Sequence, residues 1–234
     1  HDIFATSHSD LIIKYITPDD DINKTYFRAK YSPKDNHRLN DLDNYQLLIQ
    51  ESYIPDWFCD DFAEETYRKL NQIIESMIIR GRRKLLLHEG AILIGNSYIE
   101  ELKHSVIFGM YDNSTINNLD NNSEVHLMTN DSLINNMRDS TKIIKAEGFS
   151  IIKNMFDYSK IINLTQHASV GRMFNNSRIV HAKCDACIEE MYESSQADRI
   201  KHMSKVYEMH GYSVIEEMYD KTLVDKMFDK TKVN

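Results

Sequence analysis

The hydrophobic and polar positions of residues 105 to 231 follow a nine-residue repeat. Each repeat opens with a small residue, has an aliphatic residue two positions later (only Ala197 is merely small), and has an apolar residue, most often Met, five positions later. The small residues are Ser105, Ser114, Ser123, Ser132, Thr141, Ser150, Ser159, Ala168, Ser177, Ala186, Ser195, Ser204, Ser213, Thr222 and Thr231. A fixed short period over more than half of a chain indicates a repeat architecture. The repeat therefore predicts the fold, although it does not indicate the function.

The nine-residue period excludes a helix and favours a coiled β-structure. In an α-helix such a repeat turns through about 900°, so the apolar face would reverse from one repeat to the next. A coiled coil needs a period of about seven or eleven residues. The small and aliphatic residues stand two apart and so share one face of a strand, and the last positions of many repeats hold Asn and Asp, which favour turns. Strand, bend and turn within one repeat predict one side of a β-solenoid.

A second period of eighteen residues underlies the first. At this spacing recur the methionines Met137, Met155, Met173, Met191, Met209 and Met227, each but the first followed by a ring: Phe156, Phe174, Tyr192, His210 and Phe228. If residues at this spacing stack at about 4.8 Å, two repeats complete one coil. We expect a mainly β chain, a two-sided parallel β-solenoid with about 18 residues per coil and roughly seven coils. The methionines are expected in the core, since a flexible thioether fills irregular gaps, rather than at a soft metal or haem.

Other solenoid classes do not fit the pattern. The turns lack the G-G-x-G-x-D motif of calcium-binding rolls, and stepping six residues from Ile107 gives Asn113, which breaks the rule of hexapeptide helices. The repeat resembles N-S-x-V-x-x-M nonapeptide tracts in functionally uncharacterised proteins of bacteria, mobile elements and phages. The resemblance covers roughly residues 97 to 234, and it implies a parallel β-solenoid and an association with phages or mobile elements. It supplies no catalytic or binding residues.

Residues 1 to 95 are expected to form a small α/β N-terminal domain, and residues 96 to 234 the solenoid. Segments bounded by Pro, Asp and Asn clusters predict strands over residues 11–16, 24–31 and 45–53. An amphipathic pattern predicts one helix over residues 61–80, which caps the first coil because an open apolar end is an aggregation template. The chain begins at His1 rather than Met and stops in mid-repeat at Asn234, which favours a longer native protein.

Two rows of side chains on the solenoid are the candidate partner-binding residues. The aromatic row consists of Phe156, Phe174, Tyr192 and Phe228. If exposed, it offers a flat stacking surface to a protein or sugar, and if covered it is a second core strip. The basic row consists of Lys142, Lys160 and Arg178. It could follow a row of phosphates or other anions, but stacked like charges need a counter-charge, and a solvated face is the simpler interpretation.

Cys184 and Cys187 form a C-x-x-C with His181 three residues earlier, and thiolates and imidazole at such spacings ligate zinc. A four-ligand site would need a further donor, such as Cys59 or His202, brought close by the fold. The interpretation we favour gives Cys187 an outward position in a strand and puts Cys184 in a turn. No metal or other cofactor is therefore expected.

Composition and motifs favour a binding or structural role over catalysis. The formal net charge is −8, and the charges of the repeat region are mixed in sign, so neither nucleic-acid binding nor nucleic-acid mimicry is favoured. The chain has no G-x-S-x-G, P-loop, G-x-G-x-x-G or H-E-x-x-H motif, and no catalytic residue is assigned. No apolar run reaches membrane-spanning length, and three cysteines without an obvious pairing fit a reducing compartment. A cytoplasmic or virion-associated location is expected.

The leading hypothesis is a non-catalytic binding or structural module. Its rigid surface would meet an unknown protein partner, or the chain would associate with itself through the open end of the solenoid. The alternative is enzyme or effector activity in residues 1 to 95, with the solenoid as a positioning arm. A cleft lined by Asp, Glu or His in that region would favour the alternative.

Overall fold

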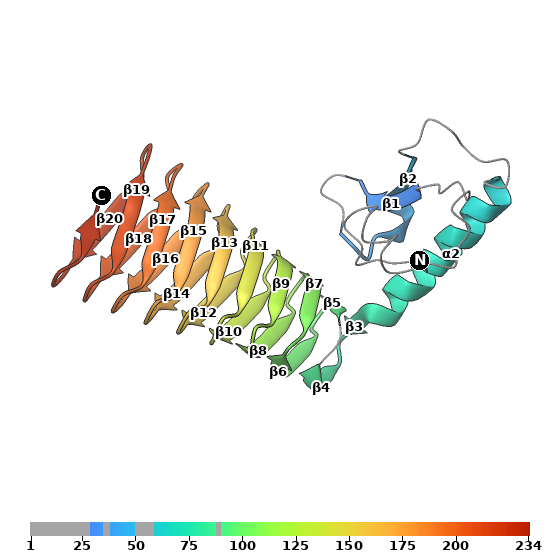
Figure 1. The fold of residues 1–234 in the computed structure, drawn as a ribbon, viewed down its shortest axis with the longest axis horizontal. Coiled ribbons are helices and arrows are strands. Elements are labelled where there is room, and N and C mark those ends of the chain that lie inside the picture. The colour runs from blue at the N-terminus through green and yellow to red at the C-terminus, as the bar shows by residue number, and fades with distance from the viewer. Residues whose placement is uncertain (1–28, 35–37, 50–58, 88–89) are drawn as a thin grey trace, which may run out of the picture. The chain divides into compact units, whose positions relative to one another are not determined.

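The computed structural model of the chain describes residues 29–34, 38–49, 59–87 and 90–234. The described part is mainly β, with parallel strands stacked into a solenoid and one α-helix before it in the sequence (Figure 1). The chain divides into two compact units, His1–Ile74 and Glu75–Asn234. The predicted fold class is therefore confirmed.

In the unit His1–Ile74, a β-hairpin packs against the start of the helix. Strands β1 (Ala29–Pro33) and β2 (Tyr45–Ile49) pair antiparallel, with the short 3-10 helix η1 (Leu42–Asn44) leading into β2. The Tyr31 hydroxyl donates to the Ala63 carbonyl at 2.7 Å, and the Tyr31 ring lies 5.7 Å from that of Tyr67. The strand predicted over residues 45–53 is described as far as Ile49. Of the strand predicted over residues 24–31, only the end is described, and it belongs to β1. The strand predicted over residues 11–16 lies outside the described residues.

Helix α2 (Asp60–Met77) is shorter than predicted, because the expected helix over residues 61–80 gives way to a strand at its end. Ile78–Arg80 form β3, in which Ile78 pairs with Ile92 in parallel register. The two isoleucines of this segment prolong the apolar pattern of the helix, but β-branched side chains also suit a pleated, half-buried surface. Pairing with a neighbouring strand therefore decides the conformation. Asp60 and Asp61 occupy the first turn of α2, where the helix dipole favours negative charge.

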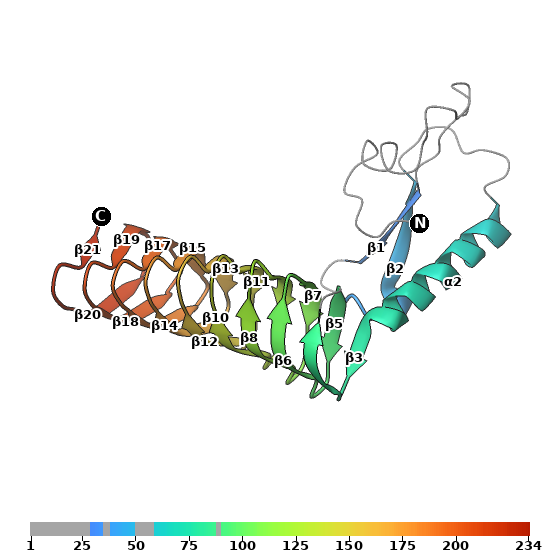
Figure 2. The same ribbon diagram turned by 60° about the horizontal axis from the view of Figure 1, so that its bottom comes forward.

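The unit Glu75–Asn234 contains a parallel β-solenoid with two sheets, which form its two walls (Figures 1 and 2). The ten-stranded sheet consists of β3, β5 (Ala91–Ile94), β7 (Val106–Met110), β9 (Glu124–Met128), β11 (Lys142–Ala146), β13 (Lys160–Thr165), β15 (Arg178–Lys183), β17 (Gln196–Ile200), β19 (Val214–Met218) and β21 (Lys232–Val233). The nine-stranded sheet consists of β4 (Arg83–Leu87), β6 (Tyr98–Lys103), β8 (Thr115–Asp120), β10 (Leu133–Met137), β12 (Ile151–Met155), β14 (Ser169–Met173), β16 (Cys187–Met191), β18 (Lys205–Met209) and β20 (Leu223–Met227).

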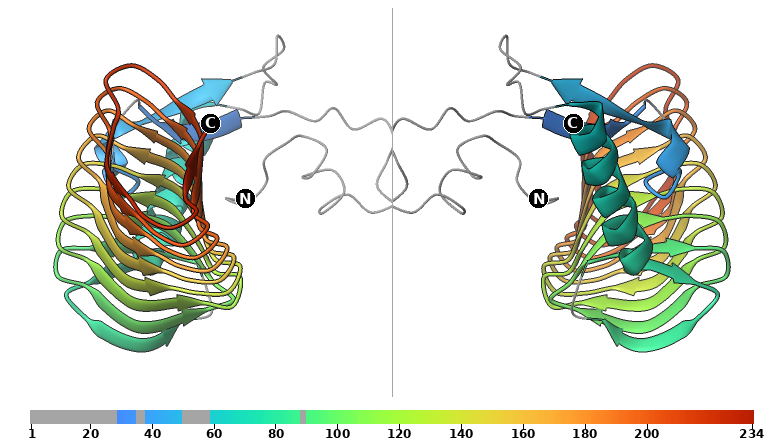
Figure 3. Two further views of the ribbon diagram at one scale, coloured as in Figure 1. Left: turned by 90° about the vertical axis from the view of Figure 1, so that its left-hand side faces the viewer. Right: turned by 90° about the vertical axis from the view of Figure 1, so that its right-hand side faces the viewer.

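The strand register confirms a coil of about 18 residues. Within the repeat each strand pairs with the strand two further along the chain, as in Met137 with Met155 and Lys142 with Lys160. Seen along the solenoid, each coil runs down one wall, turns at a narrow edge and returns along the other (Figure 3). Successive repeats belong to the two walls in turn, which is why every second repeat has similar side chains at the same positions.

The solenoid begins at Ile78, earlier than the boundary at residue 96 expected from the repeat. Strands β3 to β5 precede that boundary and belong to coils that the nine-residue spacing does not reveal. Ser97 and Ser105 stand eight residues apart, and the register between β5 and β7 shifts at Ala91 and Ile92. Hydrogen bonding between strands tolerates such irregularities, whereas a search for a fixed period does not.

The core of the solenoid is built from the two inward positions of each strand. The methionines of the eighteen-residue period are buried there as predicted, from Met137 to Met209, whereas Met227 in the last strand of its sheet is 46% exposed. The small residues that open the repeats, such as Ser150 and Ala168, are also buried at the narrow edges, except Thr222 and Thr231 in the last coil, which are partly exposed. Only a small side chain fits at these edges, which explains the strictest position of the repeat.

The turns explain the preference for Asn, Asp and Gly. The turns contain one or two residues with a positive φ, including Asn121 (52°), Asp139 (56°) and Asp157 (58°), a conformation that Gly, Asn and Asp adopt most readily. The turns are also linked from coil to coil, because the carboxylate of Asp139 accepts the N–H of Asn121 at 3.0 Å and that of Asp157 accepts the N–H of Asp139 at 3.2 Å.

Candidate binding surface

The aromatic row predicted from the sequence forms a continuous stack at one narrow edge of the solenoid. Each ring belongs to the residue that follows a strand of the nine-stranded sheet, so the parallel register of the preceding methionines places successive rings one coil apart. The centroids are 4.6 to 5.2 Å apart and the planes lie within 10° of parallel. This aromatic column consists of Phe156, Phe174, Tyr192, His210 and Phe228.

The column is neither an open stacking platform nor a second core strip. Stacking covers the faces of the inner rings, and these side chains remain partly exposed, while Phe228 is 43% exposed. A partner would therefore meet a row of ring edges, which carry the positive side of the aromatic quadrupole. His210, which was not among the candidate residues, completes the stack between Tyr192 and Phe228.

Carboxylates of the nine-stranded sheet contact the polar atoms of two rings in the column, Tyr192 and His210. The Tyr192 hydroxyl donates to Glu190 at 2.8 Å, and this hydrogen bond raises the pKa of Tyr192. The Nε2 atom of His210 lies 3.3 Å from Glu208, which also accepts a hydrogen bond from Lys226 at 2.8 Å. Lys226 and then His210 lower the pKa of Glu208. These contacts fix the orientation of the rings and put charged groups beside them.

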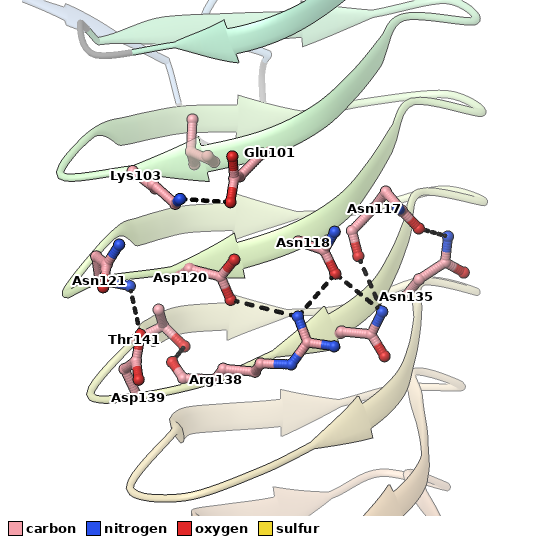
Figure 4. Close-up of polar contacts among 12 residues, drawn as sticks. Glu101, Lys103, Asn117, Asn118, Asp120, Asn121, Asn135, Arg138, Asp139 and Thr141 are labelled. Atoms are coloured by element: carbon pink, nitrogen blue, oxygen red, sulfur yellow. Dashed lines mark hydrogen bonds and ion pairs between the residues drawn. The ribbon is translucent and has the colours of Figure 1, made fainter.

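Arg138 extends the column by one coil with a cation in place of a ring. Its guanidinium carbon lies 5.7 Å from the centroid of Phe156, and its Nη1 atom donates to Asn118 at 3.0 Å and lies 3.8 Å from Oδ1 of Asp120 (Figure 4). Asp120 is 9% exposed, and burial raises the pKa of its carboxyl group. Neither residue is among those predicted from the sequence, although Arg138 and Asp120 stand eighteen and thirty-six residues before Phe156.

A ladder of asparagine amides, which was not predicted from the sequence, runs along the outer face of the same sheet. Asn136 donates to Asn118 at 3.1 Å, and Asn154 donates to Asn136 at 3.1 Å. A parallel step joins Asn135 to Asn117 at 2.9 Å. Identical amides stacked in register satisfy one another, so this wall is fixed by polar contacts as well as by its core. The eighteen-residue recurrence of Asn was the available signal.

The basic row of Lys142, Lys160 and Arg178 stacks on the outer face of the ten-stranded sheet, as the period predicts. Its two ends have acidic partners. Lys142 lies 3.0 Å from Glu124, and Arg178 makes two hydrogen bonds to Asp198, which raise the pKa of Arg178. Lys160 makes no ion pair with any residue that the structure describes. Counter-charges therefore make the like-charge stack tolerable, and much of the row is already neutralised.

The two cysteines of the C-x-x-C segment lie in a turn and in the strand that follows it. Cys184 is exposed in the turn after β15, with a positive φ of 57°, and Cys187 lies in β16, where burial raises the pKa of its thiol. His181 lies on the outer face of β15, in register with Arg199. Within the described part of the chain, no three His, Cys, Asp or Glu side chains are grouped closely enough to hold a metal ion.

A shallow cleft, largely open to solvent, lies on the exposed side of α2, within the unit His1–Ile74. It is lined by Asp61, Glu64, Glu65, Tyr67 and Arg68. Glu65 forms an ion pair with Lys69 one turn along the helix, and this contact lowers the pKa of Glu65. The cleft thus contains carboxylates of the kind that acid–base chemistry uses, but they project from a single helix.

Comparisons with models of protein families, with curated proteins and with solved structures find no match for this chain. The fold itself defines the class, a parallel β-solenoid with two strands per coil. Among the described helices, none is long and apolar enough to cross a membrane. The function is therefore inferred from the geometry of the surface.

Proposed function

We propose that this chain is a non-catalytic module that presents the surface of a β-solenoid to a protein partner, with the aromatic column as the main contact. The observation that carries the proposal is the column itself, five rings held parallel by the register of the strands and partly exposed along one edge. Tyr158, in the turn beside Phe156, is 68% exposed and enlarges the same edge. Tyrosine is among the residues that contribute most to protein interfaces.

The physical advantage of such a surface is its preorganisation. A side chain that is free in solution loses about 0.5–1.5 kcal/mol of conformational entropy when an interface immobilises it. In the column, stacking and the hydrogen bond from Tyr192 to Glu190 have already fixed the rings. The coils also repeat the contact at intervals of about 4.8 Å, so an elongated or repetitive partner would match it over several steps. These features support recognition of a protein rather than catalysis.

Affinity capture with a matched pair of variants tests the proposal. The bait is the whole chain, and the source is a lysate of the host cell, since the resemblance to mobile-element and phage proteins favours a partner there. The test variant replaces Phe156, Phe174 and Tyr192 by Leu, which keeps apolar volume but removes the flat rings. The control replaces Phe149 by Leu. Phe149 is 61% exposed at the other edge and stacks on His167. A partner retained by the wild type and the control but lost by the triple variant supports the proposal.

The opposite pattern would contradict it. A partner that the triple variant retains at unchanged affinity, with circular dichroism showing an intact fold, would exclude the column as the main contact. Self-association through the edge strands β20 and β21, each of which has one neighbour in its sheet, is a competing use of the solenoid. Light scattering over a hundredfold range of concentration separates the two, because only self-association changes the mass.

The alternative function is enzyme or effector activity in residues 1 to 95, with the solenoid as a positioning arm. The cleft on α2 favours it, since Asp61, Glu64 and Glu65 supply carboxylates. Binding that persists in the triple variant but is lost when Asp61 and Glu64 are changed to Asn and Gln would favour this alternative over the aromatic column.

A further inference from the structure

A second cleft lies on the solenoid at the narrow edge opposite the aromatic column, where β15 and β17 end. Its volume is about 310 Å³, near the lower limit of about 300 Å³ for small-molecule sites. This basic cleft is lined by His181, Ala182, Lys183, Arg199, Lys201 and His202. Five of the six side chains are cationic or become so on protonation, and no carboxylate lines the cleft. Nothing in the proposed function uses these residues.

The register places like charges on top of one another in this cleft. His181 pairs with Arg199 across β15 and β17, and the N–H of Lys201 donates to the carbonyl of Ala182 at 2.9 Å. Lys183 is the last residue of β15 and Lys201 directly follows β17, so the two lysines lie one coil apart. Like charges directly opposite each other on parallel strands destabilise a sheet. Such stacked positive charges need negative counter-charges, and the acidic side chains of the described residues supply only some of them.

The acidic partners lie on one side of the cleft only. Arg199 donates to Glu217 at 3.0 Å, and His202 lies 3.7 Å from Asp220, both in the coil that follows. On the other side, Lys183 and His181 make no ion pair with a residue that the structure describes. Positive charge is therefore in excess between the coils of β15 and β17. The same excess disfavours a metal cation at His181.

The positions of the other contacts leave the cleft open to a ligand. The Nζ atom of Lys201 lies 4.4 Å from the centroid of the Tyr219 ring, which belongs to the next coil and carries no charge to neutralise the ammonium group. The backbone turns beside the cleft are fixed, because the N–H of Asp185 donates to the carbonyl of His202 at 3.1 Å. The cations are thus presented from two adjoining strands on a rigid backbone.

We propose that the basic cleft binds a compact, multiply charged oxyanion, such as a phosphate or sulfate group, between Lys183, Lys201 and Arg199. Oxygen atoms of such a group accept charge-assisted hydrogen bonds from ammonium and guanidinium groups, which are stronger than neutral ones. The bound anion relieves the repulsion between the stacked lysines, so it stabilises the fold as it binds. Because the cleft is shallow and solvent screens its charges, the dissociation constant is expected on the order of 1 mM.

Titration of the whole chain with inorganic phosphate, at constant ionic strength kept with sodium chloride, tests this directly. Two-dimensional NMR is the readout, and saturable shifts of the amides of residues 181–185 and 199–203 are expected. Adenosine monophosphate forms the second arm of the experiment. Equal affinity for the two probes identifies the free anion as sufficient, whereas tighter binding of the nucleotide indicates that the group is recognised as part of a larger ligand.

A charge-reversal variant separates binding from folding. Lys183→Glu places a carboxylate beside Lys201, so it should raise the thermal midpoint in the absence of phosphate and weaken phosphate binding at least tenfold. Lys183→Gln should weaken binding with little effect on the fold. The control, Lys160→Gln, removes one positive charge from the same sheet without touching the cleft, and it should bind phosphate as the wild type does.

The phosphate titration has one result that supports the site and two that would contradict it. Saturable shifts confined to the cleft, lost in Lys183→Glu and kept in Lys160→Gln, support the site. No saturable shifts in the wild type would overturn it. Equal losses in Lys183→Gln and Lys160→Gln would also overturn it, because they would show a general response to net charge.

Discussion

The rings of Phe174 and Tyr192, eighteen residues apart in the sequence, stack with 5.2 Å between their centroids and 7° between their planes. Their neighbours Met173 and Met191 are paired in the parallel register of β14 and β16 and are fully buried. The same register therefore produces a buried column and, one residue later, an exposed one. The stability of the solenoid and its surface pattern have a common origin, and substitutions can test each of them separately.

Loss of one ring from the middle of the column should weaken the fold. Phe174→Ala removes stacking on both Phe156 and Tyr192. An aromatic pair contributes about 0.5–1.5 kcal/mol beyond the burial of its area, so we expect the free energy of unfolding to fall by about 2 kcal/mol. Urea unfolding followed by circular dichroism measures the change. Tyr158→Ala, at a site 68% exposed, is the control and should change stability by less than about 0.5 kcal/mol. Equal effects would show that stacking adds nothing.

Truncation of a methionine in the middle of the solenoid should destabilise the fold more than truncation of Met227 in the last strand of its sheet. Met173→Ala leaves a cavity among fully buried side chains, and such substitutions cost about 2–5 kcal/mol. Met227→Ala, in a side chain that is 46% exposed, should cost less than about 1 kcal/mol. Thermal unfolding of the two variants beside the wild type compares them. Similar shifts for both would contradict the assignment of the core.

Substitutions in the turns should destabilise the fold more when the new side chain tolerates a positive φ poorly. Asp157 has a φ of 58° and accepts the N–H of Asp139. Asp157→Val should destabilise by about 1–3 kcal/mol, because a β-branched residue is strained in this conformation. Asp157→Gly relieves the strain but, like Asp157→Val, loses this hydrogen bond and the one that Asp157 accepts from Asn175 at 3.1 Å, so it should cost about 1 kcal/mol, less than Asp157→Val. If urea unfolding shows equal midpoints for the two variants, backbone strain does not govern the turn.

Asp120 should make stability depend on pH in an unusual direction for an acid. Burial raises the pKa of its carboxyl group in the folded chain, so the fold binds the proton more tightly than the unfolded chain does. The contribution is present below the pKa of the unfolded state and is lost as the pH rises through the folded pKa, by about 1.4 kcal/mol for each unit of difference.

The test of this contribution is Asp120→Asn, which removes the ionised form and keeps the shape. At neutral pH the variant should be more stable than the wild type, although it loses the attraction of Arg138 at 3.8 Å. The gain should shrink as the pH falls and the wild-type carboxyl group becomes protonated. Thermal midpoints of both proteins between about pH 3 and 8 decide the matter. A variant that is less stable at neutral pH would show that the attraction of Arg138 outweighs burial.

The repeat predicted the solenoid because its period is imposed by geometry. A residue that stacks on its counterpart one coil later meets the same space and the same neighbours, so selection for Met at Met155, Met173 and Met191 is visible in the sequence. The first coils escaped prediction for the opposite reason. Strands β3 to β5 are held by the same hydrogen bonding, but an eight-residue step from Ser97 and a shifted register at Ala91 hide their period.

The surface was only partly predictable from the sequence. The period identified the aromatic column, since its rings occupy one register position. It could not show that ring faces are covered and edges exposed, because this depends on the spacing of the coils. Nor did it identify Arg138 beneath the column or the pairing of Arg178 with Asp198, where unlike residues meet across coils. A search for like residues does not detect such complementary contacts.

Site-specific crosslinking tests the central claim, that a partner binds along the aromatic column, most directly. A photoreactive phenylalanine analogue is placed in the whole chain at Tyr158, beside the column, or at Phe149, which is comparably exposed (68% and 61%) at the other edge. Irradiation of each variant with host lysate is followed by mass spectrometry of the crosslinked products. We predict that a specific partner is crosslinked from position 158 and not from position 149. A partner crosslinked from position 149 alone, or equally from both, would contradict the claim.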